Sequence, residues 1–358
     1  MPNENNNTET FYERAGRSHS IIPIMLVLSV LFNVSALIAP FYTAKVFLQA
    51  PYTFTLPRSV WLMWDHHFYF IALLIFFFSI VFPFLKLTVL FYIWFVCRNA
   101  AKRERLITIV GPLGKWSMLD IFVTIILMVL TNDRFLMTSS LKIGVYFFLI
   151  AIFLSMTAAL RIEIWTFAQG VKAQACNRPV SQNNGQVGHV RRILVFMLLI
   201  LSLTALVLAV NIPFIRTKDF FFANNEYSVL TAVPALWDAS KLLTVFVFVT
   251  LILGPLLHAV GLTIMWIGRL KPKFGHRLQR FLHVISTFNM LDVFCLALLI
   301  FITEGGELIM TEAKTGLYLL LVFLFCAYLI PVFMKGTHTN YLQYIKPSGE
   351  AGGPVHGE

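Results

Sequence analysis

Eight apolar stretches constrain what this chain can fold into more than any other feature. A helix needs about 20 largely apolar residues to cross a hydrocarbon core of about 30 Å, and each stretch meets or approaches that length. Only 13% of the residues are charged, about half the share of a soluble domain, so a soluble enzyme is excluded. The sequence predicts an all-α, multi-pass membrane protein with spans at Ile21–Tyr42, His67–Cys97, Trp116–Thr131, Ile143–Leu160, Ile193–Ile215, Leu242–Gly268, Phe281–Thr303 and Thr315–Met334.

The distribution of Lys and Arg predicts how these spans are oriented. Basic residues in short connections resist translocation and stay on the cytoplasmic side. With the N-terminus inside, 19 of the 28 basic residues lie in inside segments and 8 in outside segments, so both termini are expected in the cytoplasm. This bias accounts for the formal charge of +11 without a nucleic-acid partner. The polar residues 1–20 lack a signal-peptide cleavage site, so the first span is expected to remain as an anchor.

The chain repeats itself with a period of 172 to 173 residues. Met118-Leu119-Asp120 recurs as Met290-Leu291-Asp292, Pro83 as Pro255, and Trp64-Asp65 as Trp237-Asp238. Each copy holds four spans, an even number, so the two copies are expected to enter the membrane in the same orientation, as parallel repeats. The expected domains are a tail at 1–20, a four-helix unit at 21–168, a cytoplasmic linker at 169–191, a second unit at 192–335 and a tail at 336–358.

Two kinds of connection carry patterns of their own. The first outside loop of each unit, at 43–66 and 216–240, has β-branched and aromatic runs broken by Pro, Asn or Gly, which fits either a short strand pair or an irregular loop. On the inside, residues 98–110 combine basic residues with an apolar end. They are expected to form a helix along the anionic membrane surface, ended by Gly111 and Pro112.

Ionisable residues within the spans mark the candidate functional site. Each costs about 2.5 to 3.5 kcal/mol on insertion scales, so each is expected to have a partner or a water-filled cavity. Lys86 in the second span is expected to reach the level of Asp120 in the third. The second unit has a histidine in place of the lysine, and histidine can exchange a proton near neutral pH. The predicted intramembrane polar network comprises Lys86, Ser117, Asp120, Thr124, His258, Asn289 and Asp292.

Two interpretations of this network remain open. The charged residues can be neutralising pairs that hold the bundle together, or they can form a gate or a proton-sensitive element. Pro83 and Pro255, each three residues before the polar position of its span, are expected to kink their helices and to free a backbone carbonyl there.

Motifs for catalysis and for cofactors are missing from the sequence. The four cysteines, Cys97, Cys176, Cys295 and Cys326, form no Cys-x-x-Cys pair, so a zinc ribbon is not expected. Walker, GxSxG, HExxH and GxGxxG motifs are absent, and Met-Leu-Asp stands where an intramembrane aspartyl protease needs a Gly-x-Gly-Asp turn. We expect a non-enzymatic protein with no catalytic residues, no cofactor and no metal.

Two motifs resemble a known family. Residues 114–123 (GKWSMLDIFV) are similar to the G-x-W-S-M-L-D-V-F-V signature of the paraquat-inducible protein A (PqiA) family, and residues 288–294 (FNMLDVF) are a weaker copy. Residues 82–87 (FPFLKL) resemble that family's F-P-x-L-K-L motif, with residues 254–258 (GPLLH) as a diverged copy. The resemblance covers residues 20–335 as two copies of a four-helix unit, for which it implies a fold similar to tetraspanin-like and claudin-like bundles.

The resemblance also implies a function. Members of the family are inner-membrane proteins of a bacterial double-membrane envelope, and they work with a membrane-anchored periplasmic tunnel protein of the MCE (mammalian cell entry) family to move phospholipids between membranes. This chain departs from the pattern, because typical members carry Cys-x-x-Cys zinc ribbons before each unit and this chain has none. A self-sufficient proton-coupled exporter of a small amphipathic molecule, and a structural anchor for a periplasmic partner, remain as alternatives.

Overall fold

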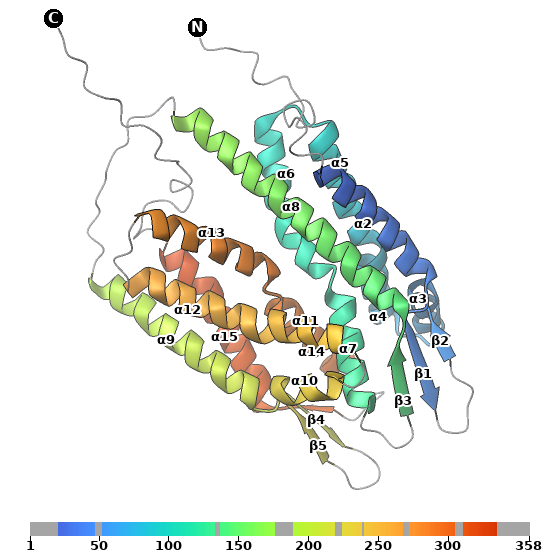
Figure 1. Ribbon diagram of the computed structural model, residues 1–358. Coiled ribbons are helices and arrows are strands. Elements are labelled where there is room, and N and C mark those ends of the chain that lie inside the picture. Colours follow the sequence, from blue (N-terminus) through green and yellow to red (C-terminus); the bar gives the residue numbers. More distant parts are fainter. Residues whose placement is uncertain are drawn as a thin grey trace, which may run out of the picture.

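The chain forms two bundles of membrane-length helices that lie side by side (Figure 1). The computed structural model describes residues 21–46, 52–132, 137–175, 189–218, 224–237, 240–267, 272–304 and 311–334. Within these residues, eight helical segments are long and apolar enough to cross a membrane, which confirms the predicted number. They are Ile21–Ile38, Tyr69–Phe95, Lys102–Val129, Ile143–Thr166, Ile193–Asn211, Lys241–Trp266, Arg277–Thr303 and Thr315–Phe333.

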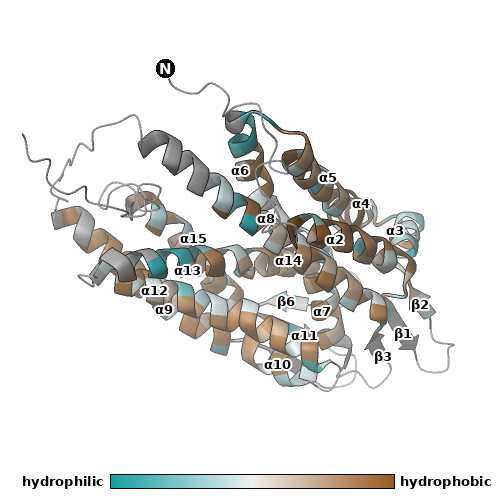
Figure 2. Cartoon of the chain, turned by 45° about the horizontal axis from the view of Figure 1, so that its top comes forward, coloured by the Kyte–Doolittle hydropathy of each residue, from teal (hydrophilic) through white to brown (hydrophobic). Residues whose placement is uncertain are grey.

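Both units build their four spans from the same order of elements. The first unit has α2 (Ile21–Ile38), then α4 (Tyr69–Ile75), the π-helix η3 (Phe76–Val81) and α5 (Phe82–Phe95), then α6 (Ala100–Trp116) and α7 (Leu119–Asn132), and last α8 (Ile143–Ala175). The second unit has α9 (His189–Asn211), then α11 (Lys241–Val247), the π-helix η4 (Phe248–Leu253) and α12 (Gly254–Ile267), then α13 (Pro272–Phe288) and α14 (Leu291–Glu304), and last α15 (Thr315–Met334). Figure 2 shows apolar residues over most of these helices and hydrophilic residues on α13 and at the start of α6.

Each unit carries a small antiparallel sheet at one end of its bundle (Figure 1). The first sheet has the strand order β2-β1-β3, with β1 (Tyr42–Val46), β2 (Tyr52–Phe54) and β3 (Met137–Leu141). The second has the order β5-β4-β6, with β4 (Ile215–Lys218), β5 (Asn224–Tyr227) and β6 (Thr311–Ala313). Of the two alternatives left open for the first loop of each unit, the strand pair is the one that the structure has, but the third strand of each sheet comes from the loop between the third and fourth spans and was not predicted. Nor were the short helices that follow, α3 (Leu56–Asp65) and α10 (Val229–Trp237).

A Lys-x-Gly-x-Tyr sequence occurs at 142–146 and again at 314–318, and its glycine connects each sheet to its bundle. The backbone N–H of Gly144 donates to the carbonyl oxygen of Pro40 at 2.9 Å, and that of Gly316 donates to Pro213 at 3.0 Å. A Cβ atom at Gly144 would lie 2.7 Å from the same carbonyl oxygen. Only glycine allows this approach of two backbones, so the motif recurs at the same place in both units.

The two units share one hydrophobic core, which is centred on α7 and α14. Leu119 and Phe122 in α7 are fully buried, and the Phe122 ring meets Phe294 of α14 edge to face with centroids 5.7 Å apart. The third span of the first unit is therefore surrounded largely by protein. Such a helix can carry an aspartate and several hydroxyl groups that a lipid-facing helix could not tolerate.

A π-helical turn precedes the proline of each second span. The N–H of Phe82 donates to the carbonyl of Phe77, and that of Gly254 donates to Val249, which are the i to i−5 bonds of a π-helix. Proline has no N–H group, so the carbonyl four residues before it loses its usual partner. The helical register thus changes immediately before Pro83 and Pro255, and the kink expected at these prolines stays a prediction.

The inside helix differs from the prediction. α6 continues through Gly111 and Pro112 to Trp116, then a two-residue turn leads into α7. It packs against α5 and α8, and Ile107 and Val110 are buried there. Tertiary packing thus overrides the expected stop and joins this helix to the third span. The ends of the expected linker are helical as well, since α8 extends to Ala175 and α9 begins at His189.

Candidate functional site

The ammonium group of Lys86 lies in a slot between α5, α6 and α8. Only 4% of the residue is exposed, and Nζ donates a hydrogen bond to Ser155 Oγ on α8 at 3.0 Å. Ser155 in turn donates to the carbonyl oxygen of Ile152 at 2.8 Å. On α6, a Cβ atom at Gly114 would lie 2.7 Å from Lys86 Nζ. The glycine of the signature motif therefore leaves the space that this lysine occupies.

Asp120 does not form the expected ion pair with Lys86. It lies in the first turn of α7, where the helix dipole favours a negative charge, and 7% of it is exposed. Among the described residues, neither Lys86 nor Asp120 has an opposite charge within 4.0 Å. Asp120 Oδ2 is buried and has no hydrogen-bond partner in the described part of the chain, and the same holds for the hydroxyl groups of Ser79 and Ser117.

Ser79 was missed in the sequence analysis, although it lies beside the Asp120 carboxyl group. It stands in η3, four residues before Pro83, and is almost completely buried. A lone serine in an apolar span gives little signal by itself. Ser79 stands four residues before Pro83, so its backbone carbonyl is the one that lacks an N–H donor because of the proline. This position is the signal that could have identified Ser79. Thr124, one turn beyond Asp120 on α7, is buried on the same side as predicted.

In the second unit, Asp292 finds its partners outside the predicted network. Tyr328 on α15 donates a hydrogen bond from its hydroxyl to Asp292 Oδ2 at 3.0 Å. Lys115, at the end of α6 in the first unit, places its Nζ 4.0 Å from the same oxygen. The charge of Lys115 also acts on His258. A cation of one unit thus reaches the carboxylate of the other, and this link takes the place of the expected pair between His258 and Asp292.

Asn289 has a local structural role. Its side-chain oxygen accepts a hydrogen bond from the backbone N–H of Leu291 at 3.3 Å, at the start of α14. Such a contact satisfies a backbone donor that the helix leaves without an internal partner. The polar position that Asn289 shares with Ser117 therefore serves different purposes in the two units.

The lysine slot exists in one unit only. At an offset of 172 residues, Lys86, Gly114 and Ser155 correspond to His258, Ser286 and Ala327. The second unit therefore loses the amine, the open space and the hydroxyl group together. The buried lysine and the buried carboxylate of the first unit are groups that can bind or release protons at membrane depth, where each charge is costly. This is the chemistry that the arrangement can support.

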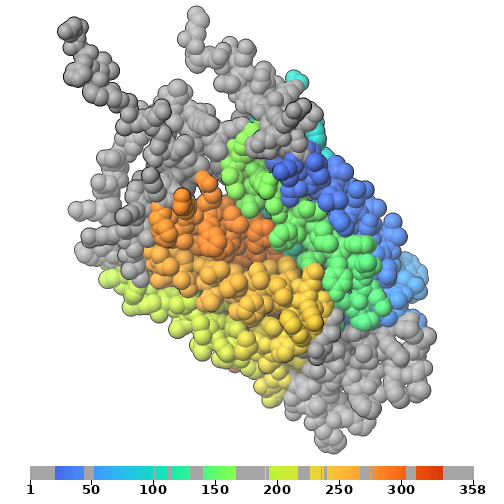
Figure 3. All heavy atoms as spheres, in the orientation of Figure 1, coloured from blue at the N-terminus to red at the C-terminus, as the bar shows by residue number. Residues whose placement is uncertain are grey.

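An apolar cavity of about 590 Å³ lies between the two units. One wall is α8, and the opposite wall is formed by α11, η4 and α12, with the end of α13 beside them. Figure 3 shows α8 in green next to α12 and α13 in gold and orange on one face of the molecule. Val249, Phe153 and Phe288 are among the lining residues, and all the lining residues belong to membrane-length segments.

Metal ligands are not gathered in the described part of the chain. Within the described ranges no three His, Cys, Asp or Glu side chains lie close enough to hold an ion. Cys97, Cys295 and Cys326 are buried free thiols, and Cys176 lies outside the described residues.

Comparison with known proteins places both units in one family. The chain matches no curated protein and no solved structure. The family model described as paraquat-inducible protein A matches it twice, over residues 22–168 and 194–337. These two ranges correspond to the two bundles, α2 to α8 and α9 to α15. The chain therefore belongs to the paraquat-inducible protein A family, and it contains two tandem copies of the region that the family model describes.

Proposed function

We propose that this protein is the inner-membrane component of an intermembrane lipid transport system, which loads or accepts phospholipid for a periplasmic MCE-type tunnel protein. The observation that carries the proposal is the apolar cavity between the two units. Its volume of about 590 Å³ falls in the range of small-ligand sites. It lies among membrane-length segments, where the acyl chains of lipids are the ligands available to it. Membership of the paraquat-inducible protein A family supports only the coarser statement of a membrane protein of the Pqi system.

The proposed orientation follows from the basic residues. The end of the bundles that holds the start of α6 and α13 carries most of the Lys and Arg, so it faces the cytoplasm. The two sheets then face the periplasm, side by side (Figure 1). Within the described residues the central strand of each sheet is flanked by two edge strands, and edge strands are common sites of protein association. Recognition of a periplasmic partner at the sheets is thus compatible with lipid entry between the units.

The polar network of the first unit is proposed to act as the gate or proton-sensitive element. Asp120 Oδ2, Ser79 Oγ and Ser117 Oγ are buried without partners in the described region, so they gain partners when water or a proton enters. A purely neutralising role requires an ion pair, and Asp120 lacks one among the described residues. The network has no arrangement of nucleophile and base, so the protein is proposed to be non-enzymatic.

The deciding experiment combines purification with transport. The tagged chain is purified from membranes together with its bound proteins and lipids, and lipid exchange is then measured between vesicles that carry the chain and vesicles that carry the copurified partner. The expected result is a single-span MCE-type partner, and exchange that requires both proteins.

Other outcomes favour the alternatives. Exchange without a partner, driven by a proton gradient, would favour the exporter. Stable association with the partner but no bound phospholipid and no exchange would leave only the structural anchor.

A further inference from the structure

Several residues of the second unit that line the cavity are smaller than their counterparts in the first unit. At the offset of 172 residues, four phenylalanines of the first unit become smaller residues in the wall of the cavity. Phe70, Phe77, Phe78 and Phe82 correspond to Leu242, Val249, Thr250 and Gly254. In the first unit, Phe78 stacks on Phe82 with ring centroids 5.5 Å apart and lies 6.0 Å from Trp116. Phe78 and Phe82 therefore pack against each other in the first unit, where the second unit has Thr250 and Gly254.

The opposite wall keeps its aromatic residues. Phe153 on α8 packs against Phe288 on α13 with ring centroids 5.1 Å apart, and both rings line the cavity. The cavity is almost entirely apolar, with the Thr250 hydroxyl engaged by the backbone carbonyl of Phe246 at 2.8 Å. An acyl chain fits such a lining, whereas a polar solute would leave its own hydrogen-bonding groups without partners.

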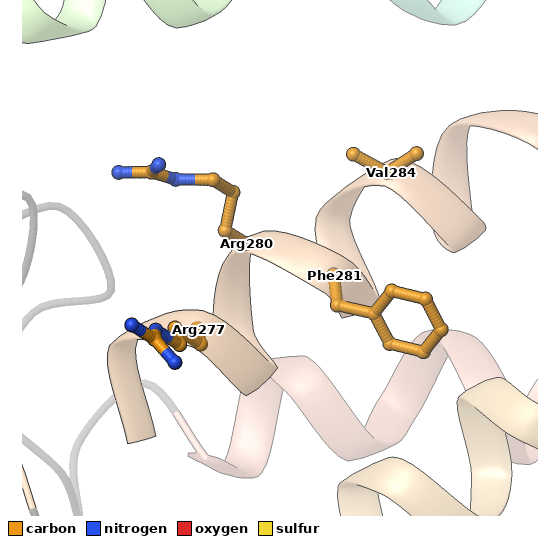
Figure 4. Close-up of a pocket in the computed structure, with 4 residues that line it drawn as sticks. All are labelled: Arg277, Arg280, Phe281 and Val284. Carbon is orange, nitrogen blue, oxygen red and sulfur yellow. The ribbon is translucent and has the colours of Figure 1, made fainter. Parts of the chain in front are cut away.

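α13 connects this cavity to a cationic one. Arg277, Phe281, Val284 and Phe288 follow each other at spacings of four, three and four residues, so they lie along one face of the helix. A cavity of about 470 Å³ is lined by Arg277, Arg280, Phe281 and Val284 (Figure 4). Val284 lines both cavities, so the two adjoin at this residue. In Figure 4 the two guanidinium groups extend to the same side, and Phe281 and Val284 lie further along α13.

The charges of the two arginines are available to a ligand. Both side chains are exposed, and neither has a carboxylate within 4.0 Å among the described residues. Glu163, an acidic residue of α8, is engaged by His283 of α13 at 3.5 Å. Arg277 is the first residue of the membrane-length segment, so it stands at the end of that span. Two arginines one turn apart at the end of a span have the charge and the hydrogen-bond donors that bind a phosphate group.

We propose that this composite site binds one phospholipid with a net negative charge, with its phosphate between Arg277 and Arg280 and one acyl chain in the cavity between α8 and α12. The proposal rests on the proposed function and names the site on the cytoplasmic side at which the substrate is held. Phosphatidylglycerol has the required chemistry. The described part of the first unit lacks an equivalent site, because it has Thr108 in place of the second arginine and phenylalanine at four positions that correspond to lining residues of the cavity.

The test measures phospholipid retained by the purified full-length chain. The protein is delipidated in detergent, incubated with mixed micelles of phosphatidylglycerol or phosphatidylcholine, and weighed by native mass spectrometry. We expect one tightly held phosphatidylglycerol. Replacement of both arginines (R277Q with R280Q) should weaken its binding about tenfold or more, since each charge-assisted contact is worth roughly that factor. Leu242→Phe with Val249→Phe restores the residues of the first unit, and it should weaken the binding of both lipids.

The matched control is Arg105→Gln, which removes a charge at the position of α6 that corresponds to Arg277. It should leave lipid binding unchanged. Equal losses in the control and in the arginine pair, or unchanged binding in the pair, would overturn the site. Glycerol phosphate is a headgroup without acyl chains. If it binds to the arginines as well as the lipid does, the arginines recognise a soluble anion, and the proposed lipid site is overturned.

Failure of the site and failure of the proposed function give different results. If lipid is held as expected but never reaches the partner, the site stands and the transport function does not. If exchange with the partner continues at full rate in the phenylalanine variant, with its lipid lost, the function stands and the site does not.

Discussion

Gly114 offers a direct test of the lysine slot. A methyl group at this position would lie 2.7 Å from Lys86 Nζ and 3.2 Å from its Cε atom, so Gly114→Ala forces the ammonium group away from Ser155. Overpacking of this kind costs about 1 to 3 kcal/mol. Alanine in a helix is more stable than glycine by about 0.5 to 1 kcal/mol. The expected net effect is a loss of about 0 to 2.5 kcal/mol in the free energy of unfolding.

The chain provides a matched control one turn earlier on the same helix. A Cβ atom at Gly111 would meet nothing within 4 Å beyond its chain neighbours, so Gly111→Ala should cost no packing, and the following Pro112 should reduce the helical benefit of alanine there. Reversible unfolding in mixed micelles with increasing denaturing detergent gives both free energies. A double-mutant cycle with Lys86→Leu completes the design, because leucine lacks the two atoms that the methyl group meets. In that background Gly114→Ala should no longer be harmful.

Equal stabilities of the two alanine variants in the natural background would refute the reasoning. They would mean that the Lys86 amine does not pack against Gly114. Lipid exchange measured on the same variants separates packing from function: a displaced amine should slow exchange in Gly114→Ala even where the protein remains abundant in the membrane.

Three further predictions concern the network, the topology and the metal content. Asp120→Asn should abolish lipid exchange while the protein still inserts, and combining it with Lys86→Leu should not restore exchange; full rescue by the double variant would return the pair to a neutralising role. Asp292→Asn should have a smaller effect, as judged by exchange and membrane abundance, since its hydrogen bond from Tyr328 can persist to the amide oxygen. A cysteine at Asn225, in β5, should react with an impermeant thiol reagent from outside, and Cys176 should not; the reverse labelling would invert the topology. Elemental analysis of the purified chain should find no stoichiometric zinc, and about one zinc per chain would reveal a site assembled across the fold.

The fold was largely predictable because its main determinants are local or periodic. Apolar length identified the spans, and recurring Pro, Trp and Asp at one offset identified the two units, independently of which helices touch. The expected stop at Pro112 failed because a proline removes only one hydrogen bond, and burial of Ile107 and Val110 against neighbouring helices outweighs that loss. The third strand of each sheet was not predicted for a related reason. A pairing between β1 and β3 joins segments about ninety residues apart, and alternation within one segment carries no information about such a partner.

The candidate site was predictable as a set of residues but not as a set of contacts. Lys86, Asp120, Thr124 and Asp292 were recognised because polar groups at membrane depth are rare. Lys115 was counted only as an inside charge, since its position before the signature aspartate suggests a neighbour in its own unit. Its actual partner is the aspartate of the other unit, and that geometry depends on how α6 crosses to α14. Sequence spacing along one helix cannot supply a distance between two bundles.

The covalent connection between the two units has a consequence for specialisation. A homodimer of identical units has an isologous interface, so every substitution appears twice and the two halves stay equivalent. Here the copies share one chain, and each position can change independently. One half therefore holds a buried amine against a serine, and the other has exchanged bulky rings for an open groove beside two arginines. Because the duplicated units lie in a single polypeptide, they keep the same architecture while their side chains differ.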